Sequence, residues 1–154
     1  MTKNLYVMVG LPGSGKSTYL QQFKKDCIII SRDSIRFSML GDTYFDNEKL
    51  VFKEFVNQIQ SAIDSNNYKN IYADATHISE KSRNKLLNKL NLKGVSIHII
   101  FINTPIDVCI ERNSHRDGIE KVPEEVVRDF QDKLELPTHN EKYKYKSILE
   151  VRSF

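Results

Sequence analysis

Near the start of this 154-residue chain, a run of glycines is followed by a lysine and two hydroxyl residues. The run reads Gly10-Leu-Pro-Gly-Ser-Gly-Lys16-Ser17-Thr18, which fits a glycine, four free positions and then Gly-Lys-Ser. Glycines let successive backbone N–H groups turn toward one anion, and a following helix adds its free N–H groups and positive end. The lysine reaches the β- and γ-phosphates, and the serine hydroxyl is a ligand for Mg²⁺. We therefore expect ATP, or another nucleoside triphosphate, to bind here with Mg²⁺.

The residues on either side of this loop have the order that such a loop needs. The apolar run 5–9 before it predicts a strand, and 18–24 after it predicts a helix. The alternative is a Gly- and Pro-rich turn without a ligand, but such a turn does not require the lysine and serine in register. The loop residues expected to bind the nucleotide are Gly10, Pro12, Gly13, Ser14, Gly15, Lys16, Ser17 and Thr18.

Two acids follow predicted strands and are candidates for the chemistry of phosphoryl transfer. Asp33 is a candidate for the base that orients an attacking hydroxyl, which is typically worth roughly 100- to 10,000-fold in rate. The alternative is that either Asp33 or Ser34 caps a helix that begins here. Asp74, at the end of the run 70–74, is a candidate ligand for Mg²⁺, directly or through water, or else bonds to a neighbouring turn.

Three arginines have spacings that suit phosphate contacts. Arg36 lies about one helical turn after Asp33, where it could hold a phosphate of the acceptor or be an ordinary surface arginine. Arg112 and Arg116 are four residues apart, which places them on one face if the segment is helical. The polar segment 112–122 then predicts a lid whose arginines contact the transferring phosphate, the alternative being a solvated helix end.

The elements that must position these groups alternate along the chain. Strands are predicted at 5–9, 27–30, 70–74, 95–102 and 147–151, and helices at 18–24, 33–39, 48–66, from 79, from 104 and from 122 to 137. The order predicts one α/β domain over 1–154, with three layers and a mostly parallel sheet. Ligands in such folds bind at the carboxyl ends of the strands, so the candidate residues should converge at one edge.

Finer expectations follow from local patterns. The all-apolar run 27–30 predicts a strand buried on both faces. Thr104 and Pro105 predict a helix with Thr as cap and Pro at the first position. The basic residues of the helix from 79 predict a solvated face. They are Lys81, Arg83, Lys85, Lys89 and Lys93.

Composition narrows the class of protein. The chain is 40% hydrophobic and 28% charged, as in ordinary globular proteins, and its net charge of +3 permits an anionic substrate without requiring one. Cys27 and Cys109 lie in apolar runs, which predicts buried, reduced thiols. We see no signal peptide or membrane-spanning stretch, so we expect a cytoplasmic protein; the oligomeric state stays open.

Several of these segments together resemble the kinase domain of phage polynucleotide 5′-kinases and, more broadly, the small phosphate-loop kinases grouped with it. They are Gly10 to Thr18, Ser31-Arg-Asp-Ser-Ile-Arg36, Asp74-Ala-Thr-His77, Arg112-Asn-Ser-His-Arg-Asp-Gly118 and Val122-Pro123. The resemblance covers almost the whole chain in the same order. It implies ATP and Mg²⁺ as cofactors, single-stranded 5′ ends of RNA or DNA as substrate, and a role in nucleic-acid repair.

The resemblance also implies roles for individual residues. Asp33 would act as the base on the 5′-hydroxyl, and Arg36 would contact the phosphate on the 3′ side of the acceptor. Arg116 would contact the ATP phosphates, with Arg112 as the second arginine of that segment. Asp74 and Thr76 would belong to the acceptor side. The chain lacks the Asp-x-Asp-x-Thr motif of the phosphatase domain in the phage enzymes, so we expect a kinase alone.

Two other functions stay open at this point. Related small kinases phosphorylate nucleosides, sugars or antibiotics, so a small-molecule acceptor is the first alternative. The second is a nucleotide-dependent switch that hydrolyses ATP slowly without an acceptor. The Asp33 and Arg36 pair disfavours a switch, because a switch needs no base for an acceptor hydroxyl.

Overall fold

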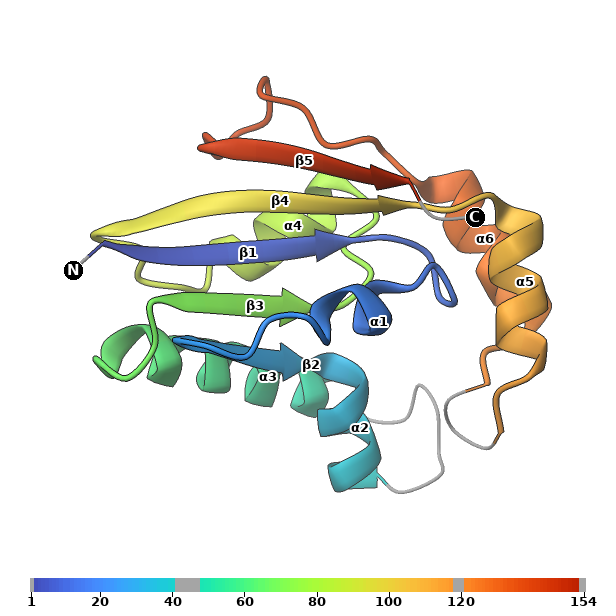
Figure 1. Ribbon diagram of the computed structural model, residues 1–154, viewed down its shortest axis with the longest axis horizontal. Coiled ribbons are helices and arrows are strands. Elements are labelled where there is room, and N and C mark those ends of the chain that lie inside the picture. Colours follow the sequence, from blue (N-terminus) through green and yellow to red (C-terminus); the bar gives the residue numbers. More distant parts are fainter. Residues whose placement is uncertain (1, 41–47, 118–120, 153–154) are drawn as a thin grey trace.

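The computed structural model describes residues 2–40, 48–117 and 121–152, and five parallel strands form its sheet (Figure 1). The strand order is β2-β3-β1-β4-β5, and every pair of neighbours is parallel. Because the strands are parallel, their carboxyl ends meet at one edge, on the right in Figure 1. The strands are β1 Lys3–Val9, β2 Cys27–Ser31, β3 Asn70–Asp74, β4 Val95–Asn103 and β5 Ser147–Arg152.

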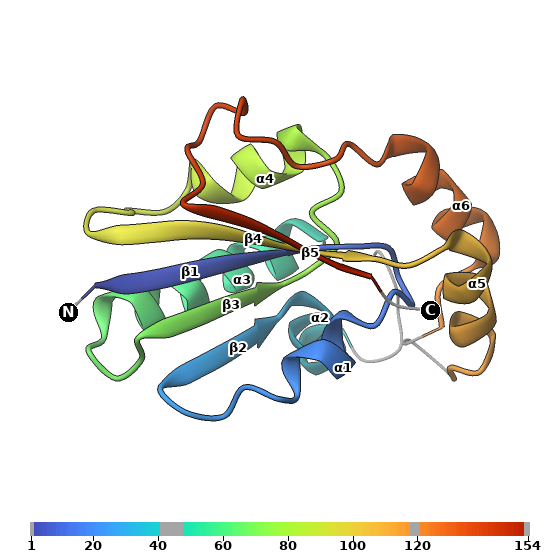
Figure 2. The ribbon, with the colours of Figure 1, turned by 45° about the horizontal axis from the view of Figure 1, so that its top comes forward.

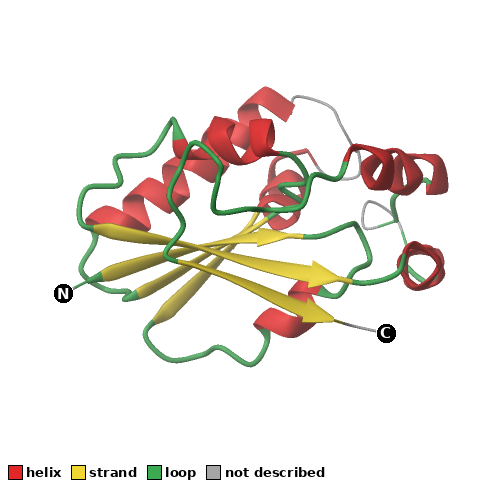
Figure 3. Cartoon of the chain, turned by 90° about the horizontal axis from the view of Figure 1, so that it is seen from above, coloured by secondary structure: helices red, strands yellow, loops and turns green. Residues whose placement is uncertain are grey.

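Helices lie on both faces of this sheet, as Figure 3 shows with the sheet seen nearly edge-on. The helices are α1 Lys16–Leu20, α2 Arg32–Leu40, α3 Glu48–Asp64, α4 Glu80–Leu87, α5 Ile106–Ser114 and α6 Glu124–Lys133. Helices α3 and α4 pack on one face and α1 on the other, whereas α5 and α6 stand beyond the carboxyl ends of the strands (Figure 2). The prediction of an α/β fold with a parallel sheet between helices is confirmed.

The alternation of side chains along β1 explains the two faces. Leu5, Val7 and Val9 point to the same face and pack in the main core with residues of α3. Met8 points to the opposite face, where it packs with Leu20 of α1. These four side chains of β1 are fully buried, and burial of a side chain of this size is worth about 1.5–3 kcal/mol.

Strand β2 departs from the prediction that both its faces are buried. It lies at an edge of the sheet and pairs only with β3. Ile29 is therefore 39% exposed, while Ile30 on the other face is buried. An all-apolar run cannot distinguish a central strand from an edge strand, because that depends on which strands pair with it.

Helix ends also differ from the predictions. Pro105, not Thr104, is the N-cap of α5, because the Thr104 hydroxyl donates to the carbonyl of Ser14 instead, at 2.7 Å. The first helix ends at Leu20, before the predicted Lys24, and α6 ends at Lys133, since Leu134 is extended. Neither Asp33 nor Ser34 caps α2: the Ser31 hydroxyl accepts the Ser34 N–H, at 3.2 Å.

Some expectations fall outside the described residues. Gly41 and the polar turn at 42–47 do so, as do residues 118–120 of the predicted lid. Both cysteines are free thiols, with Cys109 buried and Cys27 half-buried. In the parts of the chain that the structure describes, every helix is too short or too polar to cross a membrane.

Candidate active site

The loop between β1 and α1 has a conformation that depends on its glycines. Gly13 and Gly15 have φ angles of 80° and 101°, in the left-handed region that glycine adopts without strain. A Cβ atom on Gly13 would lie 2.5 Å from the carbonyl oxygen of Cys109 in α5. Only glycine therefore fits at position 13, both for its backbone angles and for its contact with α5.

Several hydrogen bonds hold this loop to the rest of the domain. The Gly10 N–H donates to the carbonyl of Thr76, at 3.0 Å, which ties the loop to the segment after β3. The Ser14 carbonyl accepts from the hydroxyl of Thr104, at 2.7 Å, and from Nη1 of Arg112, at 3.1 Å. The loop is thus braced by a neighbouring strand end and by α5 before any ligand binds.

Lys16 folds back over the loop. Its ammonium donates to the carbonyls of Gly10 and Leu11, at 3.0 and 2.9 Å. Desolvation of the ammonium lowers the pKa of Lys16, while the nearby carboxylates of Asp74 and Asp33 act in the opposite direction. A phosphate at the loop would therefore meet an ammonium whose charge is only partly balanced by neighbouring carboxylates.

Ser17 and Asp74 come together at the carboxyl ends of β1 and β3. The Ser17 hydroxyl donates to the Asp74 carboxylate at 3.4 Å, and Asp74 is buried. Burial raises the pKa of Asp74, an effect that the charge of Lys16 opposes. The described residues contain no group of three or more His, Cys, Asp or Glu side chains that could hold a metal. A hydroxyl and one carboxylate fit Mg²⁺, which takes its remaining ligands from phosphates and water.

Asp33 and Arg36 form an ion pair within α2, and Glu48 of α3 holds the arginine from the other side. Nε and Nη2 of Arg36 donate to the two carboxylate oxygens of Glu48, each at 2.7 Å, and Nη1 donates to Asp33. The Arg36 side chain is 6% exposed and that of Asp33 is 75% exposed. Arg36 is therefore not a surface arginine, and Asp33 presents its carboxylate to solvent.

The ionised form of Glu48 is favoured in this arrangement. Burial alone would raise the pKa of Glu48, but the hydrogen bond and charge of Arg36, with a smaller contribution from Arg32, hold it below its usual value. The Glu48 carboxylate is thus a fixed negative charge beside Arg36. Its bidentate pairing leaves the guanidinium little freedom to change orientation.

These groups line one cavity of about 270 Å³. Of the residues predicted from the sequence, Pro12, Gly13, Gly15, Lys16, Ser17, Asp33, Arg36, Asp74, Thr76 and Arg116 line it. Gly10, Ser14, Thr18 and Arg112 do not. The loop and the acids are far apart in the chain, yet the parallel sheet places them around the same space, as expected for the carboxyl ends of strands.

The two arginines of the predicted lid point to different targets. Helix α5 ends at Ser114, so Arg116 lies beyond it and the helical spacing that would align the pair does not apply. Arg112 binds the loop carbonyl of Ser14, whereas Arg116 lines the cavity. The side-chain amide of Asn113 donates to the Val122 carbonyl and accepts from the Val122 N–H, which ties the end of α5 to the residues just before α6. That the segment moves as a lid stays a prediction.

Sequence reasoning missed several residues of the cavity. Arg32, Glu48, Phe52, Ser82, Lys85 and Phe130 also line it, as does Val122 of the predicted lid segment. The ammonium of Lys85 lies 4.7 Å from the centre of the Phe52 ring, and the Arg32 guanidinium carbon lies 5.4 Å from it. Lys85 is exposed, as predicted for the solvated face of this helix, and it lines the cavity as well. Its place at the cavity depends on how α3 and α4 pack, which no local pattern reveals.

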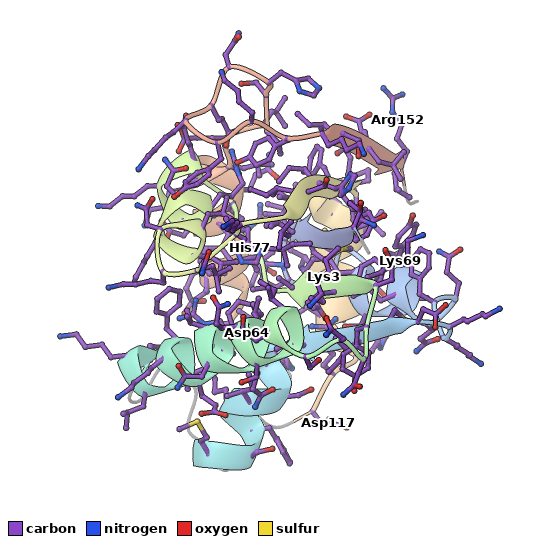
Figure 4. All side chains as sticks on the ribbon, turned by 90° about the vertical axis from the view of Figure 1, so that its left-hand side faces the viewer. Lys3, Asp64, Lys69, His77, Asp117 and Arg152 are labelled. Atoms are coloured by element: carbon purple, nitrogen blue, oxygen red, sulfur yellow. The ribbon has the colours of Figure 1, made fainter. Side chains whose placement is uncertain are left out.

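His77 is buried, lines the cavity and lies inside the molecule in Figure 4. Its backbone has a φ of 43°, and its Nδ1 lies 2.7 Å from the carbonyl of Met8. A carbonyl only accepts, so Nδ1 carries the hydrogen. Burial lowers the pKa of His77 to about 4, and the ring is neutral at physiological pH. The contact with the Met8 carbonyl of β1 therefore fixes the orientation of the His77 ring.

Arg83 contradicts the prediction of a wholly solvated basic face on α4. Its side chain is fully buried and makes two bonds to Glu141, at 3.0 and 2.8 Å. It also donates to the carbonyls of His77 and Glu135, at 2.7 and 3.1 Å. Through these contacts with Glu135 and Glu141, Arg83 holds the segment after α6 against α4. No local pattern could predict this pairing, because Glu141 lies 58 residues away.

The fold and loop define a P-loop nucleotide-binding domain, in which a strand, a glycine-rich loop and a helix surround the phosphates. The chain belongs to the AAA domain family, which matches residues 5–137.

One curated relative is the L-seryl-tRNA(Sec) kinase of Methanococcus maripaludis, which is 28% identical over 149 residues. The alignment covers 86% of this chain and 53% of that protein, so the chain spans about half the length of this relative.

Solved structures share the fold at lower identity. One is a chain of the Pnkp1/Rnl/Hen1 RNA repair complex, at 21% identity and a TM-score of 0.73, covering 86% of this chain and 44% of that one. A fungal RNA kinase is 14% identical, with a TM-score of 0.70 and coverages of 97% and 74%. A sugar kinase from Janibacter sp. HTCC2649 is 19% identical, with a TM-score of 0.60 and coverages of 99% and 86%.

Proposed function

We propose that this domain is a kinase that transfers the γ-phosphate of ATP to a hydroxyl group, and that the hydroxyl is the 5′ end of RNA or DNA. The observation that carries the proposal is the exposed carboxylate of Asp33 at the same cavity as Lys16 and Asp74. Phosphoryl transfer needs cations on the phosphates and a group that orients the attacking hydroxyl. The cavity holds candidates for both.

Each residue has a proposed role in this reaction. The loop backbone binds the phosphates, Lys16 and Arg116 stabilise the charge of the transferring group, and Ser17 with Asp74 would hold Mg²⁺. The metal, when bound, neutralises the β- and γ-phosphate oxygens. Asp33 accepts the proton of the attacking hydroxyl, and Arg36 keeps the Asp33 carboxylate in place while Glu48 fixes Arg36.

A nucleic-acid acceptor is supported by the relatives. The tRNA kinase, the RNA kinase and the RNA repair complex all have names that include RNA. The basic residues Arg32 and Lys85 beside the cavity favour an anionic acceptor. The resemblance to phage polynucleotide 5′-kinases adds the 5′-hydroxyl to this proposal, together with a repair role and a kinase domain over residues 1–154 with a lid at 112–122.

A small-molecule acceptor is the second candidate, and the structural likeness to a sugar kinase favours it. A switch without an acceptor is third. The exposure of Asp33 argues against a switch. A switch has no acceptor hydroxyl, so it does not need a carboxylate that is open to the cavity.

The test uses γ-labelled ATP and Mg²⁺ with matched 5′-hydroxyl RNA and DNA oligonucleotides, the same oligonucleotides bearing a 5′-phosphate, and a panel of nucleosides and sugars. We expect label on the 5′-hydroxyl oligonucleotides and none on the phosphorylated ones. Label on a nucleoside or sugar alone would replace the polynucleotide with a small molecule. ATP hydrolysis at the same rate with and without every acceptor would favour the switch.

A further inference from the structure

We propose that Lys85 binds a phosphate group of the acceptor, and that Phe52 holds the Lys85 ammonium toward the cavity. The inference rests on the proposed function and names the class of acceptor: a molecule with a phosphate close to the hydroxyl that is phosphorylated. Lys85 belongs to α4 and Phe52 to α3, and both line the cavity beside Asp33.

The balance of charge at this end of the cavity points to Lys85. Both ends of the Arg36 guanidinium are occupied by carboxylates, Glu48 on one side and Asp33 on the other. Arg32 shares the same Glu48 carboxylate, at 3.4 Å. Lys85 makes no ion pair with a carboxylate of the described residues, and so contributes a positive charge that an incoming anion can balance.

The Phe52 ring explains why this lysine would be ordered. The Lys85 ammonium lies 4.7 Å from the centre of the Phe52 ring, within the roughly 6 Å over which a cation is attracted to an aromatic face. Arg32 lies near the same ring, at 5.4 Å. Phe52 stands on α3 next to Val51, which is fully buried, so the ring is attached to a fixed part of the core. A lysine held in this way loses less side-chain entropy when it binds an anion.

The chemistry of an ammonium favours phosphate over the other acceptor groups. A lysine is a compact point charge that commonly binds phosphate. A neutral nucleoside or sugar would leave the Lys85 charge unbalanced, whereas a 3′-phosphate or a phosphodiester next to the reacting hydroxyl would balance it. Both sources share this chemistry, and acceptors of different length distinguish them.

Steady-state kinetics with Lys85→Ala test the contact. The acceptors are a nucleoside 3′-monophosphate, a 5′-hydroxyl dinucleotide with one phosphodiester, and the free nucleoside. We expect the KM of both phosphate-bearing acceptors to rise roughly tenfold, with the KM of ATP and the KM of the free nucleoside unchanged. A rise for only one of the two phosphate-bearing acceptors would identify its phosphate as the one bound.

Three further variants control this experiment. Lys85→Arg keeps the charge and should restore most of the affinity. Phe52→Leu should raise the same KM values by a smaller factor, roughly threefold, because it releases the ammonium without removing it. Lys81→Ala removes an exposed lysine of the same helix that does not line the cavity, and should change nothing. Equal changes for acceptors with and without phosphate, or no change in Lys85→Ala, would overturn the inference.

Binding without turnover separates this inference from the proposed function. Fluorescence anisotropy of a labelled 5′-hydroxyl oligonucleotide, in the presence of ADP, should show roughly tenfold weaker binding by Lys85→Ala than by the wild type. Wild-type binding without transfer in the labelling assay would overturn the kinase and leave the Lys85 contact intact. Equal binding by the two proteins, or no binding by the wild type, would overturn the contact.

Discussion

The two ends of the cavity are built in different ways. The donor end, which we define as the loop 10–18 with Asp74, consists mainly of backbone groups. Its shape depends on glycines, on the hydrogen bond that the Gly10 N–H donates to the Thr76 carbonyl, and on the one that the Thr104 hydroxyl donates to the Ser14 carbonyl. The acceptor end, which we define as Asp33, Arg36, Glu48, Phe52 and Lys85, consists of side chains from three helices. Its shape depends on ion pairs and on a cation beside an aromatic ring.

This difference follows from the chemistry that each end would serve. A phosphate chain is the same in every nucleoside triphosphate, so a loop of backbone N–H groups suits all of them. Acceptors differ, and side chains can change without changing the fold. Structures with different acceptors in their names accordingly share this fold with the present chain.

The strongest test of the acceptor end is Asp33→Asn, which keeps the size of the side chain and removes the base. We expect the rate of phosphoryl transfer to fall by roughly 100- to 10,000-fold, with ATP binding unchanged. Transfer rates and calorimetric titration with an ATP analogue measure the two properties. Asp64→Asn, on the exposed side of α3 away from the cavity, is the matched control. Full transfer by Asp33→Asn would remove the proposed base.

The support of the acceptor end is tested by Glu141→Gln, which breaks the buried pair with Arg83 and so loosens α4, the helix of Lys85. We expect the free energy of unfolding to fall by about 3 kcal/mol, because an uncompensated charge would stay buried. Urea denaturation measures this change.

The matched control for that variant is Glu124→Gln, which breaks the exposed pair with Arg128. It should cost at most about 1 kcal/mol, since exposed ion pairs contribute little. Similar losses in the two variants would mean that the burial of Arg83 does not matter to the fold.

A pH dependence is expected from His77, which joins the segment after β3 to the strand that precedes the loop. Its pKa is about 4 in the folded protein, against 6.5 for a histidine in the unfolded chain. Its contribution to stability is therefore complete above pH 6.5 and is lost as the pH falls toward 4. Linkage predicts that lowering the pH from about 7 to about 5 removes about 2 kcal/mol of unfolding free energy through this residue.

Urea denaturation of the wild type and His77→Asn at both pH values measures that contribution. Asparagine tolerates a positive φ and can also donate to the Met8 carbonyl, but it does not titrate. We expect a smaller pH dependence in this variant, and no such reduction in His139→Asn, which changes an exposed histidine. The same pH dependence in all three proteins would rule out His77 as its source.

The donor end is tested by a pair of glycine substitutions. Gly13 and Gly94 both have positive φ angles, but a Cβ on Gly94 meets nothing within 4 Å, whereas one on Gly13 would strike the Cys109 carbonyl. Gly94→Ala should cost about 1 kcal/mol of stability and leave ATP binding unchanged. Gly13→Ala should also weaken ATP binding, by roughly tenfold, because the loop must shift. Calorimetry and urea denaturation separate the two effects, and equal ATP affinities would contradict a backbone-built donor end.

The elements of the donor end could be predicted from the sequence because their determinants are local, whereas the roles of its residues stay predictions. The loop pattern, the strand before it and the acid at the end of β3 are each readable within a few residues, and β3 begins and ends where its pattern predicted. The sheet with helices on both faces followed from the alternation of apolar runs.

The acceptor end was harder to predict from the sequence, because its determinants are contacts between distant segments. One partner of Arg36 is Glu48 of another helix, and Lys85 reaches the cavity only because α3 and α4 pack on the same face of the sheet. The same reason hid the pairing of Arg83 with Glu141 and the edge position of Ile29. A lysine or arginine in a helical pattern looks the same whether it faces solvent, a cavity or a buried acid.

The most direct test of the proposed reaction is a crystal structure of the protein with ADP, Mg²⁺, aluminium fluoride and a 5′-hydroxyl dinucleotide. We predict the 5′ oxygen within about 3.2 Å of the Asp33 carboxylate, the distance that proton transfer requires. We also predict ADP on the loop 10–18, and the phosphodiester beside Lys85. A dinucleotide bound outside the cavity, or a 5′ oxygen remote from Asp33 while ADP occupies the loop, would contradict the role of Asp33 as the base.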